Sequence, residues 1–196
     1  MGKIFASTYD LWMGPLERKG LGPIRKHLIR KARGRVLEIG SGTGFNFPYY
    51  RGTGKVTAID PEPAMTKQAK ARAEKAHVPI EVITVGGEKL PFPDHSFDTV
   101  VGTLVLCTIP DPYKALKEVR RVCRPGGQVL FLEHVRVRQP LLGRIQDGLT
   151  PIWKRLCDGC HLNRNPLEPI ERAGLKVVRV NRYFREIFLT IEAIHP

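Results

Sequence analysis

The chain has 196 residues, of which 42% are hydrophobic and 26% are charged. This balance is typical of a globular domain with a sizeable core. No apolar run reaches the roughly 18 residues of a membrane-spanning helix and no secretory signal is evident, so a cytoplasmic location is expected. Four cysteines fit a reducing compartment and exclude a disulfide scaffold. The formal charge of +13 predicts an anionic partner: nucleic acid, an acidic substrate or an anionic membrane surface.

Two helical segments are predicted at the start of the chain. Residues 1–21 fit a short helix that caps a ligand cleft, with aromatic side chains at Phe5, Tyr9 and Trp12. Residues 22–33 fit a helix with an early proline and an apolar stripe formed by Ile24, Leu28 and Ala32. The favoured interpretation of this basic helix is a surface helix that packs its stripe on a sheet. The alternative is contact with anionic lipid headgroups, made by Arg25, Lys26, Arg30 and Lys31.

The central motif is an apolar strand, residues 36–39, that runs into alternating glycines at Gly40, Gly42 and Gly44. Glycine allows positive φ and a close approach of the backbone to a ligand, and a helix is expected soon after the turn. The next strand ends in Asp60, roughly 20 residues past the first glycine, where dinucleotide folds bond ribose hydroxyls. We therefore expect a nucleoside-cofactor site at the carboxyl edge of a parallel sheet.

The glycine spacing narrows the cofactor class. It is Gly-x-Gly-x-Gly, because position 45 is Phe, whereas a pyrophosphate-binding loop places its third glycine one residue later. With Glu38 inside the preceding strand, this spacing favours a cofactor that lacks a pyrophosphate. The alternative is a plain strand-turn-helix connection in an α/β protein.

Strands and helices alternate over residues 35–133, which predicts an α/β fold with a doubly wound, mostly parallel sheet. The predicted helices are 61–76 and 111–123, and the further strands are 80–85, 99–106 and 128–133. After residue 134 the pattern changes to a helix at 140–156 that is interrupted near Pro151, a polar loop at 157–164, a short helix at 166–173 and an antiparallel strand pair at 177–180 and 187–193. No internal repeat or linker is visible, so we expect one domain: an N-terminal cap (1–33), a cofactor-binding core (34–135) and an acceptor side (136–196).

The cysteines do not predict a metal site. Cys157 and Cys160 have Cys-x-x-Cys spacing beside His161, but a closed zinc site needs four ligands and no second pair is visible. A redox pair normally opens a helix after a strand. A structural or substrate-lining loop is therefore favoured, and Cys107 and Cys123 are expected in the core.

Four blocks in order, VLEIGSGTG, Asp60, GGEKLPFPDHSFDTVV and RVCRPGG, resemble the class I S-adenosylmethionine-dependent methyltransferases over roughly residues 33–135. LPFPDHSFDTVV and RPGG look most like the ubiquinone/menaquinone C-methyltransferases and small phospholipid N-methyltransferases. DGCHLNR, with Val105-Leu106-Cys107 and Glu133-His134, is similar to the methyltransferase-like 7 proteins, which are membrane-associated alkyl thiol methyltransferases. The resemblance implies a seven-stranded Rossmann-like sheet, S-adenosyl-L-methionine as cofactor and S-adenosyl-L-homocysteine as product.

The resemblance also implies roles for individual residues. Glu38, Gly40, Ser41, Gly42 and Gly44 would shape the methionine pocket. Asp60 would bond both ribose hydroxyls, and the remaining cofactor contacts implied are Tyr9, Pro61, Met65, Gly87, Glu88, Thr103 and Leu104. Because the sulfonium is already activated, positioning and exclusion of water supply most of the acceleration.

His134 is the best-placed candidate base, and a strand-end histidine bonded to backbone is the alternative. The expected acceptor is a small lipophilic thiol, phospholipid headgroup or quinol at a membrane surface, with peripheral attachment to the inner membrane face. A rival is an RNA methyltransferase, although the Asn-Pro-Pro-Tyr motif is missing and stacking aromatics are few, so nucleic acid is not favoured. A second rival is a non-catalytic cofactor-binding module.

Overall fold

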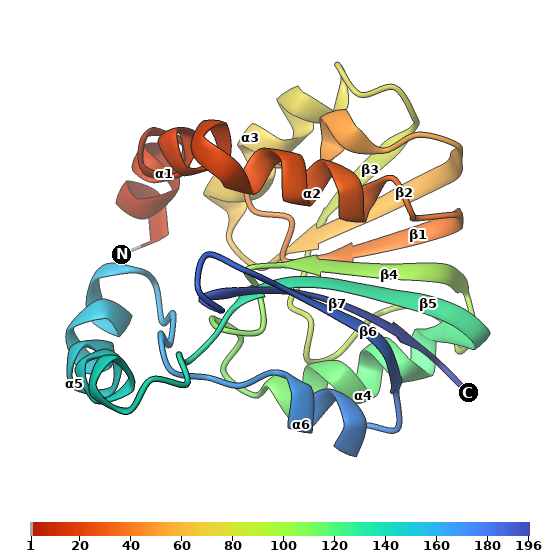
Figure 1. Cartoon of the computed structure of the whole chain (residues 1–196). Helices are drawn as coiled ribbons and strands as arrows, with labels where there is room; N and C mark the ends of the chain where they lie inside the picture. Colours follow the sequence, from red (N-terminus) through yellow and green to blue (C-terminus); the bar gives the residue numbers. More distant parts are fainter. Residues whose placement is uncertain (1) are drawn as a thin grey trace.

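A seven-stranded sheet forms the centre of the computed structural model, which describes residues 2–196 apart from the side chains of residues 2–5 and 7 (Figure 1). The prediction for Phe5 lies outside the described side chains. The strand order is β3-β2-β1-β4-β5-β7-β6. All neighbours are parallel except the pairs made by β7, which runs antiparallel to both β5 and β6. The doubly wound, mostly parallel sheet with an antiparallel C-terminal pair is therefore confirmed. The strands are β1 (Gly34–Ile39), β2 (Thr53–Asp60), β3 (Ile80–Thr84), β4 (Phe97–Thr103), β5 (Cys123–His134), β6 (Lys176–Tyr183) and β7 (Phe188–Ile194).

One face of the sheet is covered by α2 (Gly22–Ile29) and α3 (Pro63–Ala73), whereas α1 (Gly2–Leu16) extends beyond the carboxyl ends of the strands (Figure 1). A π-helical turn (Glu17–Leu21) joins α1 to α2. The apolar stripe of α2 packs on the sheet through Leu28 and Ile29, which are fully buried. The favoured prediction for this helix, packing on the sheet, agrees with that contact.

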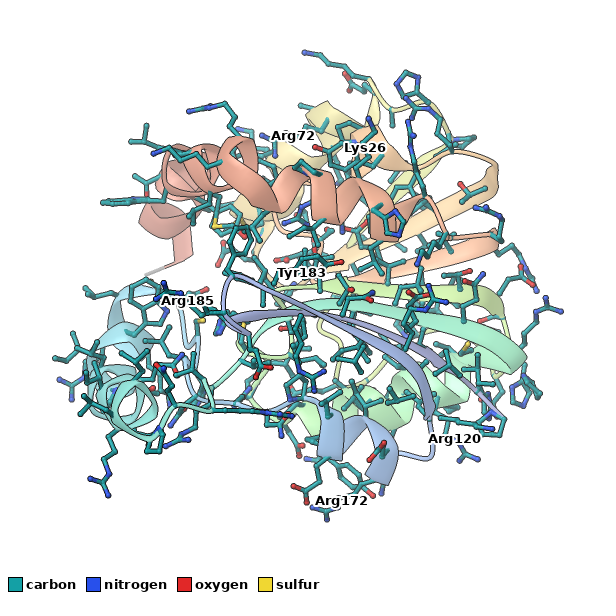
Figure 2. All side chains as sticks on the ribbon, in the orientation of Figure 1. Lys26, Arg72, Arg120, Arg172, Tyr183 and Arg185 are labelled. Atoms are coloured by element: carbon teal, nitrogen blue, oxygen red, sulfur yellow. The ribbon has the colours of Figure 1, made fainter. Side chains whose placement is uncertain are left out.

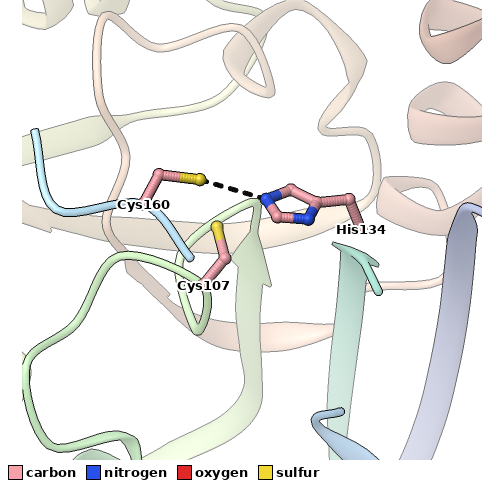
Figure 3. A group of neighbouring side chains, drawn as sticks. All are labelled: Cys107, His134 and Cys160. Atoms are coloured by element: carbon pink, nitrogen blue, oxygen red, sulfur yellow. Dashed lines mark hydrogen bonds between the residues drawn. The ribbon is translucent and has the colours of Figure 1, made fainter. Parts of the chain in front are cut away.

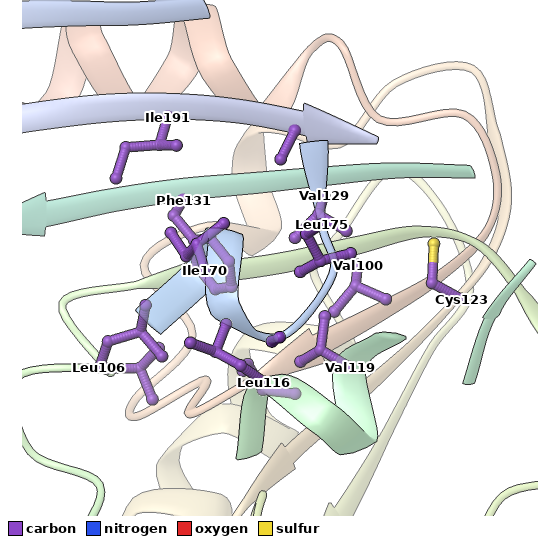
Figure 4. Close-up of a cluster of buried hydrophobic side chains, with 14 of the residues drawn as sticks. Val100, Leu106, Leu116, Val119, Cys123, Val129, Phe131, Ile170, Leu175 and Ile191 are labelled. Carbon is purple, nitrogen blue, oxygen red and sulfur yellow. The ribbon is translucent and has the colours of Figure 1, made fainter. Parts of the chain in front are cut away.

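The opposite face is covered by α4 (Pro112–Val122) and α6 (Leu167–Arg172) (Figure 1). Asp111 caps α4 by accepting a hydrogen bond from Lys114 N over 3.0 Å. Leu116 and Val119 of α4 pack with Ile170 of α6 against the central strands (Figure 4). With both faces covered, β1, β4 and β5 are buried along most of their length, as is typical of central strands in a parallel sheet.

The segment after the glycine loop differs from the prediction. A helix was expected there, but a single 3₁₀ turn (Phe47–Tyr49) is present. Pro48 lacks the amide hydrogen that a longer helix would use, and Phe47 and Tyr50 turn into the core beneath the loop. The chain therefore returns at once to β2.

Positive charge is spread over the molecule rather than confined to residues 22–33. Figure 2 shows Lys26 and Arg72 on the helices of one face, Arg120 and Arg172 on those of the other, and Arg185 at the β6–β7 turn. Basic side chains therefore lie on the helices of both faces of the sheet as well as at this turn.

The helix α5 (Pro140–Leu156) lies beyond the carboxyl ends of the strands, on the same side of the molecule as α1 (Figure 1). It continues through Pro151, so the interruption expected near that proline is absent from this helix. Among residues 2–196, no helix combines the length and apolar character that crossing a bilayer requires.

Candidate functional site

The three glycines after β1 bring the backbone to the carboxyl edge of the sheet. Gly40, Gly42 and Gly44 have φ values of 61°, 54° and 89°, which glycine adopts without strain. A Cβ atom on Gly40 would overlap the side chain that follows β4, and one on Gly44 would lie 2.7 Å from the Phe47 ring. A Cβ atom on Gly42 would have its nearest neighbour, a Tyr9 ring carbon, at 3.9 Å. Gly40 and Gly44 are thus required by packing, whereas a Cβ atom on Gly42 would make only an ordinary contact with Tyr9.

Asp60 ends β2, and two backbone amides hold its carboxylate. Gly42 N donates to Oδ2 over 2.9 Å and Glu62 N donates to Oδ1 over 3.0 Å. Glu62 in turn caps α3 by accepting from Ala64 N. Burial raises the pKa of Asp60, and each oxygen keeps one further acceptor position. Asp60 therefore links the glycine loop to α3 and retains capacity to accept from a ligand. We call the loop over residues 40–44 together with Asp60 the glycine-loop edge.

The helix α1 contacts the glycine-loop edge and the neighbouring Phe45. The Tyr9 and Phe45 rings lie 6.0 Å apart between centroids, and burial raises the pKa of Tyr9. Asp10 accepts from Thr43 Oγ1 over 2.7 Å and pairs with Arg72 of α3. These contacts fix Tyr9 beside the loop.

A buried charge network lies behind the loop, and sequence reasoning missed it. Arg25 is 2% exposed. Its guanidinium donates to Glu17 over 2.7 Å, to Asn46 Oδ1 over 2.6 Å and to Thr103 Oγ1 over 2.7 Å. The prediction that Arg25 contacts lipid headgroups is therefore wrong. A helical period carries no signal for a buried arginine whose partners come from other segments of the chain.

Glu38 belongs to the same network. Tyr50 Oη donates to its Oε2 over 2.6 Å, and Asn46 Nδ2 donates to its Oε1 over 2.9 Å. Burial raises the pKa of Glu38 to about 7, although these hydrogen bonds act in the opposite direction. Asn46 also donates to Thr103 Oγ1 over 3.1 Å. Glu38 thus orients Asn46 and Thr103 from beneath the loop.

The other predicted cofactor contacts surround this edge with different access. Pro61 is exposed, and Met65 of α3 is buried. Glu88 Oε1 accepts from Asp111 N over 2.9 Å, which directs its side chain toward the start of α4. Gly87 lies against the loop between β4 and α4. Pro61 and Met65 therefore belong to the segment that follows Asp60, whereas Gly87 and Glu88 contact the segment that leads into α4.

Leu104 follows β4 with a φ of 56°, a left-handed conformation that is uncommon for a bulky residue and concentrated at functional sites. The next two amides, of Val105 and Leu106, donate to Glu133 Oε1 over 3.0 and 3.1 Å. Glu133 is buried, and burial raises its pKa to about 7. Its Oε2 has no hydrogen-bond partner among the described residues.

Three donor side chains meet beside this turn: Cys107, His134 and Cys160 (Figure 3). We call them the cysteine–histidine group. Cys107 follows β4, His134 ends β5 and Cys160 lies in the loop after α5. The His134 Nε2 atom lies 3.1 Å from Cys160 Sγ, and all three donor atoms lie within 4.8 Å of one another. Cys157 is not part of the group, so the Cys-x-x-Cys spacing did not identify the partners of Cys160.

The electrostatics of the group favour a thiolate beside an imidazolium. A hydrogen bond from Cys107 lowers the pKa of Cys160 to about 4, with a further contribution from His134. The same hydrogen bond raises the pKa of Cys107. Burial lowers the pKa of His134, but the hydrogen bond to Cys160 leaves it raised overall. His134 therefore contacts a side chain rather than the backbone groups of the alternative interpretation.

A cavity of about 140 Å³ opens beside the group. It is lined by Cys107 and His134, by Glu133, by Arg164 and by apolar side chains that include Leu116. It lies between the end of β5 and the helices α4 and α6. This cavity can hold a small, partly apolar molecule next to the donor atoms.

An apolar surface flanks both sites. The helix α5 exposes side chains that are at least 41% accessible: Leu141, Leu142, Ile145, Leu149, Ile152, Trp153 and Leu156. The helix α1 adds Leu11, Trp12 and Leu16, which are at least 50% accessible. We call these ten side chains the α1–α5 apolar surface. Exposed apolar clusters of this kind mark contact with a partner, a ligand or a membrane.

Comparison with known proteins agrees with this architecture. Residues 37–131 match the family model described as "Methyltransferase domain". A SAM-dependent methyltransferase of Thermotoga maritima has the same fold, with a TM-score of 0.72 and 21% identity, over 99% of this chain and 97% of that one.

Relatives at higher identity include two thiol S-methyltransferases. TMT1B of Rattus norvegicus is 42% identical over 74% of this chain and 61% of its own length. TMT1A of Homo sapiens is 35% identical over 90% and 74%, respectively. A phosphatidylethanolamine N-methyltransferase of Cereibacter sphaeroides is 39% identical over 69% of this chain and 68% of its own length. The chain thus spans about three fifths of the rat protein. These matches show that the chain belongs to the class I S-adenosylmethionine-dependent methyltransferases.

Proposed function

We propose that the chain transfers a methyl group from S-adenosylmethionine to the sulfur of a small lipophilic thiol at a membrane surface. The observation that carries the proposal is the cysteine–histidine group. It places a proton-accepting centre and a small cavity on the carboxyl side of β4 and β5. The similarity to two thiol S-methyltransferases supports the same acceptor.

The residues of the glycine-loop edge fit the family's cofactor. Ser41 Oγ is buried without a hydrogen-bond partner in the described structure, and the nearest neighbour of a Cβ atom on Gly42 would be Tyr9 at 3.9 Å. Asp60 keeps two acceptor positions, which matches the two hydroxyls of a ribose. We assign Ser41, Gly42, Asp60 and Tyr9 to direct contact with the cofactor.

The remaining residues implied by the resemblance support or border that contact. Gly40 and Gly44 allow the turn, and Glu38 acts as a positioning residue through Asn46. We assign six further residues to the border of the cofactor site: Pro61, Met65, Gly87, Glu88, Thr103 and Leu104.

When bound, S-adenosylmethionine supplies a methyl group already activated as a sulfonium. The chain's residues therefore have to bind, orient and remove one proton. The turn at Leu104 and the buried Glu133 fix the backbone between the two sites. A thiol in the cavity needs to lose its proton, because the thiolate is the nucleophile. We assign that deprotonation to the cysteine–histidine group, in which the Cys160 thiolate accepts the proton and His134, the residue predicted from sequence, stabilises that thiolate.

The α1–α5 apolar surface supports contact with a membrane. Its two helices lie beyond the carboxyl ends of the strands (Figure 1), and α5 also carries basic residues such as Arg144 and Lys154. Burial of exposed leucine and isoleucine in the acyl region is favourable by about 25 cal/mol per Å². We therefore assign membrane contact to this surface rather than to helix α2.

The test is labelled-methyl uptake by the purified chain from a panel of an alkyl thiol, phosphatidylethanolamine, demethylmenaquinol and RNA. The thiol should be methylated, with turnover that depends on His134. Methylation of the lipid amine instead would replace the proposal with the activity named for the Cereibacter sphaeroides relative. Cofactor binding without uptake by any of the four would favour a binding module.

A further inference from the structure

We propose that the cysteine–histidine group binds one Zn²⁺ ion and leaves a fourth coordination position open toward the cavity. This differs from the expectation of no metal drawn from the sequence, which paired Cys160 with Cys157. The metal site rests on the geometry of the three side chains alone. Its role in activating an acceptor rests on the proposed thiol acceptor.

The spacing of the donors fits a tetrahedral ion. Zinc bonds sulfur and imidazole nitrogen at about 2.3 and 2.0–2.1 Å, which sets its ligand atoms about 3.5–3.8 Å apart. The Sγ atoms of Cys107 and Cys160 and the Nε2 atom of His134 already lie within 4.8 Å of one another. The closest pair, His134 and Cys160, is separated by 3.1 Å. Movements of less than an ångström or so would complete the arrangement, within the range of rotamer adjustments.

The backbone around the donors is built to hold them. His161 N donates to Cys107 O over 2.8 Å, which ties the loop of Cys160 to the loop of Cys107. Arg164 Nη1 donates to the carbonyls of Leu106 and Ile109 over 2.7 and 2.6 Å. His134 is fixed at the end of a central strand. Metal sites depend on such outer contacts to orient their ligands.

The donor set selects the metal and the kind of site. Two thiolates and a neutral imidazole suit zinc, and their charge balances a divalent ion. Three protein ligands with one open position are typical of catalytic rather than structural zinc. Cys107 and His134 both line the cavity, and so does Glu133, whose buried Oε2 has no partner among the described residues. An unpaired carboxylate oxygen beside the donors is an independent sign that a ligand completes this place.

The site explains how a thiol would become a nucleophile. The acceptor sulfur binds the ion at the open position, its S–H bond breaks and the proton leaves to solvent. A coordinated thiol is deprotonated outright. The ion stays divalent throughout, so no oxidant or reductant is needed. In this arrangement His134 is a ligand, and metal coordination of the thiol takes the place of proton removal by the Cys160 thiolate.

The first experiment measures zinc by mass spectrometry after the reduced full chain is equilibrated with Zn²⁺ and desalted. About one ion per chain is expected. Cys107→Ser, His134→Gln and Cys160→Ser should each lose most of it. Cys157→Ser and His161→Gln are matched controls from the same loop and should retain it. Wild-type stoichiometry in Cys160→Ser, or no zinc in the reduced wild type, would overturn the proposal.

Co²⁺ provides a second readout that does not depend on turnover. Bound at the site, it should give thiolate-to-metal charge-transfer bands and the strong visible bands of tetrahedral cobalt. An alkyl thiol should shift these bands and an alkyl amine should not. If the thiol leaves these bands unchanged, the proposal of an open coordination position is wrong. A Cys107–Cys160 disulfide in chain purified without reductant, together with failure of the reduced chain to bind Co²⁺, would identify a redox pair instead.

The two proposals fail separately. Thiol methylation that survives complete removal of zinc by a chelator would refute the metal's role and leave the proposed function intact. Stoichiometric zinc with no methylation of any thiol would refute the thiol acceptor and leave the metal site intact.

Discussion

The glycine-loop edge and the cysteine–histidine group lie at the same end of one sheet, but the chain assembles them differently. The first is built from residues close in sequence, between Gly40 and Asp60, and a buried charge network supports it from below. The second joins three loops or strand ends that are 26 to 53 residues apart (134 to 160, and 107 to 160). The first edge is therefore part of the folding core. The second depends on how the loops after β4 and α5 meet the end of β5.

The largest predicted effect tests the support beneath the glycine loop. Arg25→Ala leaves the buried carboxylate of Glu17 without its partner, so we expect a loss of about 3–5 kcal/mol in the free energy of unfolding. Lys26→Ala, on an exposed position of the same helix, should change it by less than about 0.5 kcal/mol. Urea unfolding of both variants measures the difference. Equal stabilities would mean that the Arg25 network does not support this edge.

Asp60→Ala tests the ligand side of the same edge. Removal of the acceptor that we propose for both ribose hydroxyls should weaken cofactor binding by at least about 100-fold, measured by isothermal titration. Glu81→Gln, on the neighbouring strand β3, is the matched control and should bind normally. Near wild-type affinity in Asp60→Ala would remove the ribose assignment.

The sequence predicted the first edge well because its signals are local. A glycine at positive φ and a carboxylate at a strand end can both be recognised from neighbouring residues, and Asp60 lies where the pattern placed it. The alternation of strands and helices likewise predicted the sheet. The prediction of a helix after the loop was wrong, because the local sequence pattern does not indicate that Phe47 and Tyr50 pack into the core.

The second group could not be predicted, because its contacts are made only in the folded chain. Cys107 appeared to be a core residue and is buried, but its sulfur faces two partners that the sequence places far away. The nearer cysteine, Cys157, was the apparent partner of Cys160. The prediction for Arg25 was wrong for the same reason, because the burial of a charged side chain depends on partners from remote segments of the chain.

The pH dependence of the free energy of unfolding tests the protonation state of Glu38, a buried acid beneath the glycine loop. Burial raises the pKa of Glu38 to about 7 from 4.5, so the folded state keeps this proton where the unfolded chain has lost it. Its contribution to stability is complete below about pH 4.5 and is lost as pH rises through about 7. The slope for one group is at most about 1.4 kcal/mol per pH unit. Glu38→Gln should flatten the slope in this window in urea unfolding. A slope identical to wild type would show that Glu38 stays ionised.

The smallest expected effect separates the two surfaces considered for membrane contact. Ile152 of α5 is 60% exposed, and its transfer into the acyl region should contribute on the order of 1.4 kcal/mol. Ile152→Ser should therefore weaken binding to anionic vesicles roughly tenfold in sedimentation assays. Lys26→Gln with Arg30→Gln removes two exposed charges from α2 and should leave binding within about twofold if α2 faces water; contact with headgroups would cost about 1 kcal/mol for each charge. A large loss in the α2 variant with none in Ile152→Ser would return the contact to the basic helix. The α1–α5 apolar surface would then have to contact something other than lipid, because exposed apolar clusters mark contact with a partner, a ligand or a membrane. We would in that case assign this surface to binding of the lipophilic acceptor.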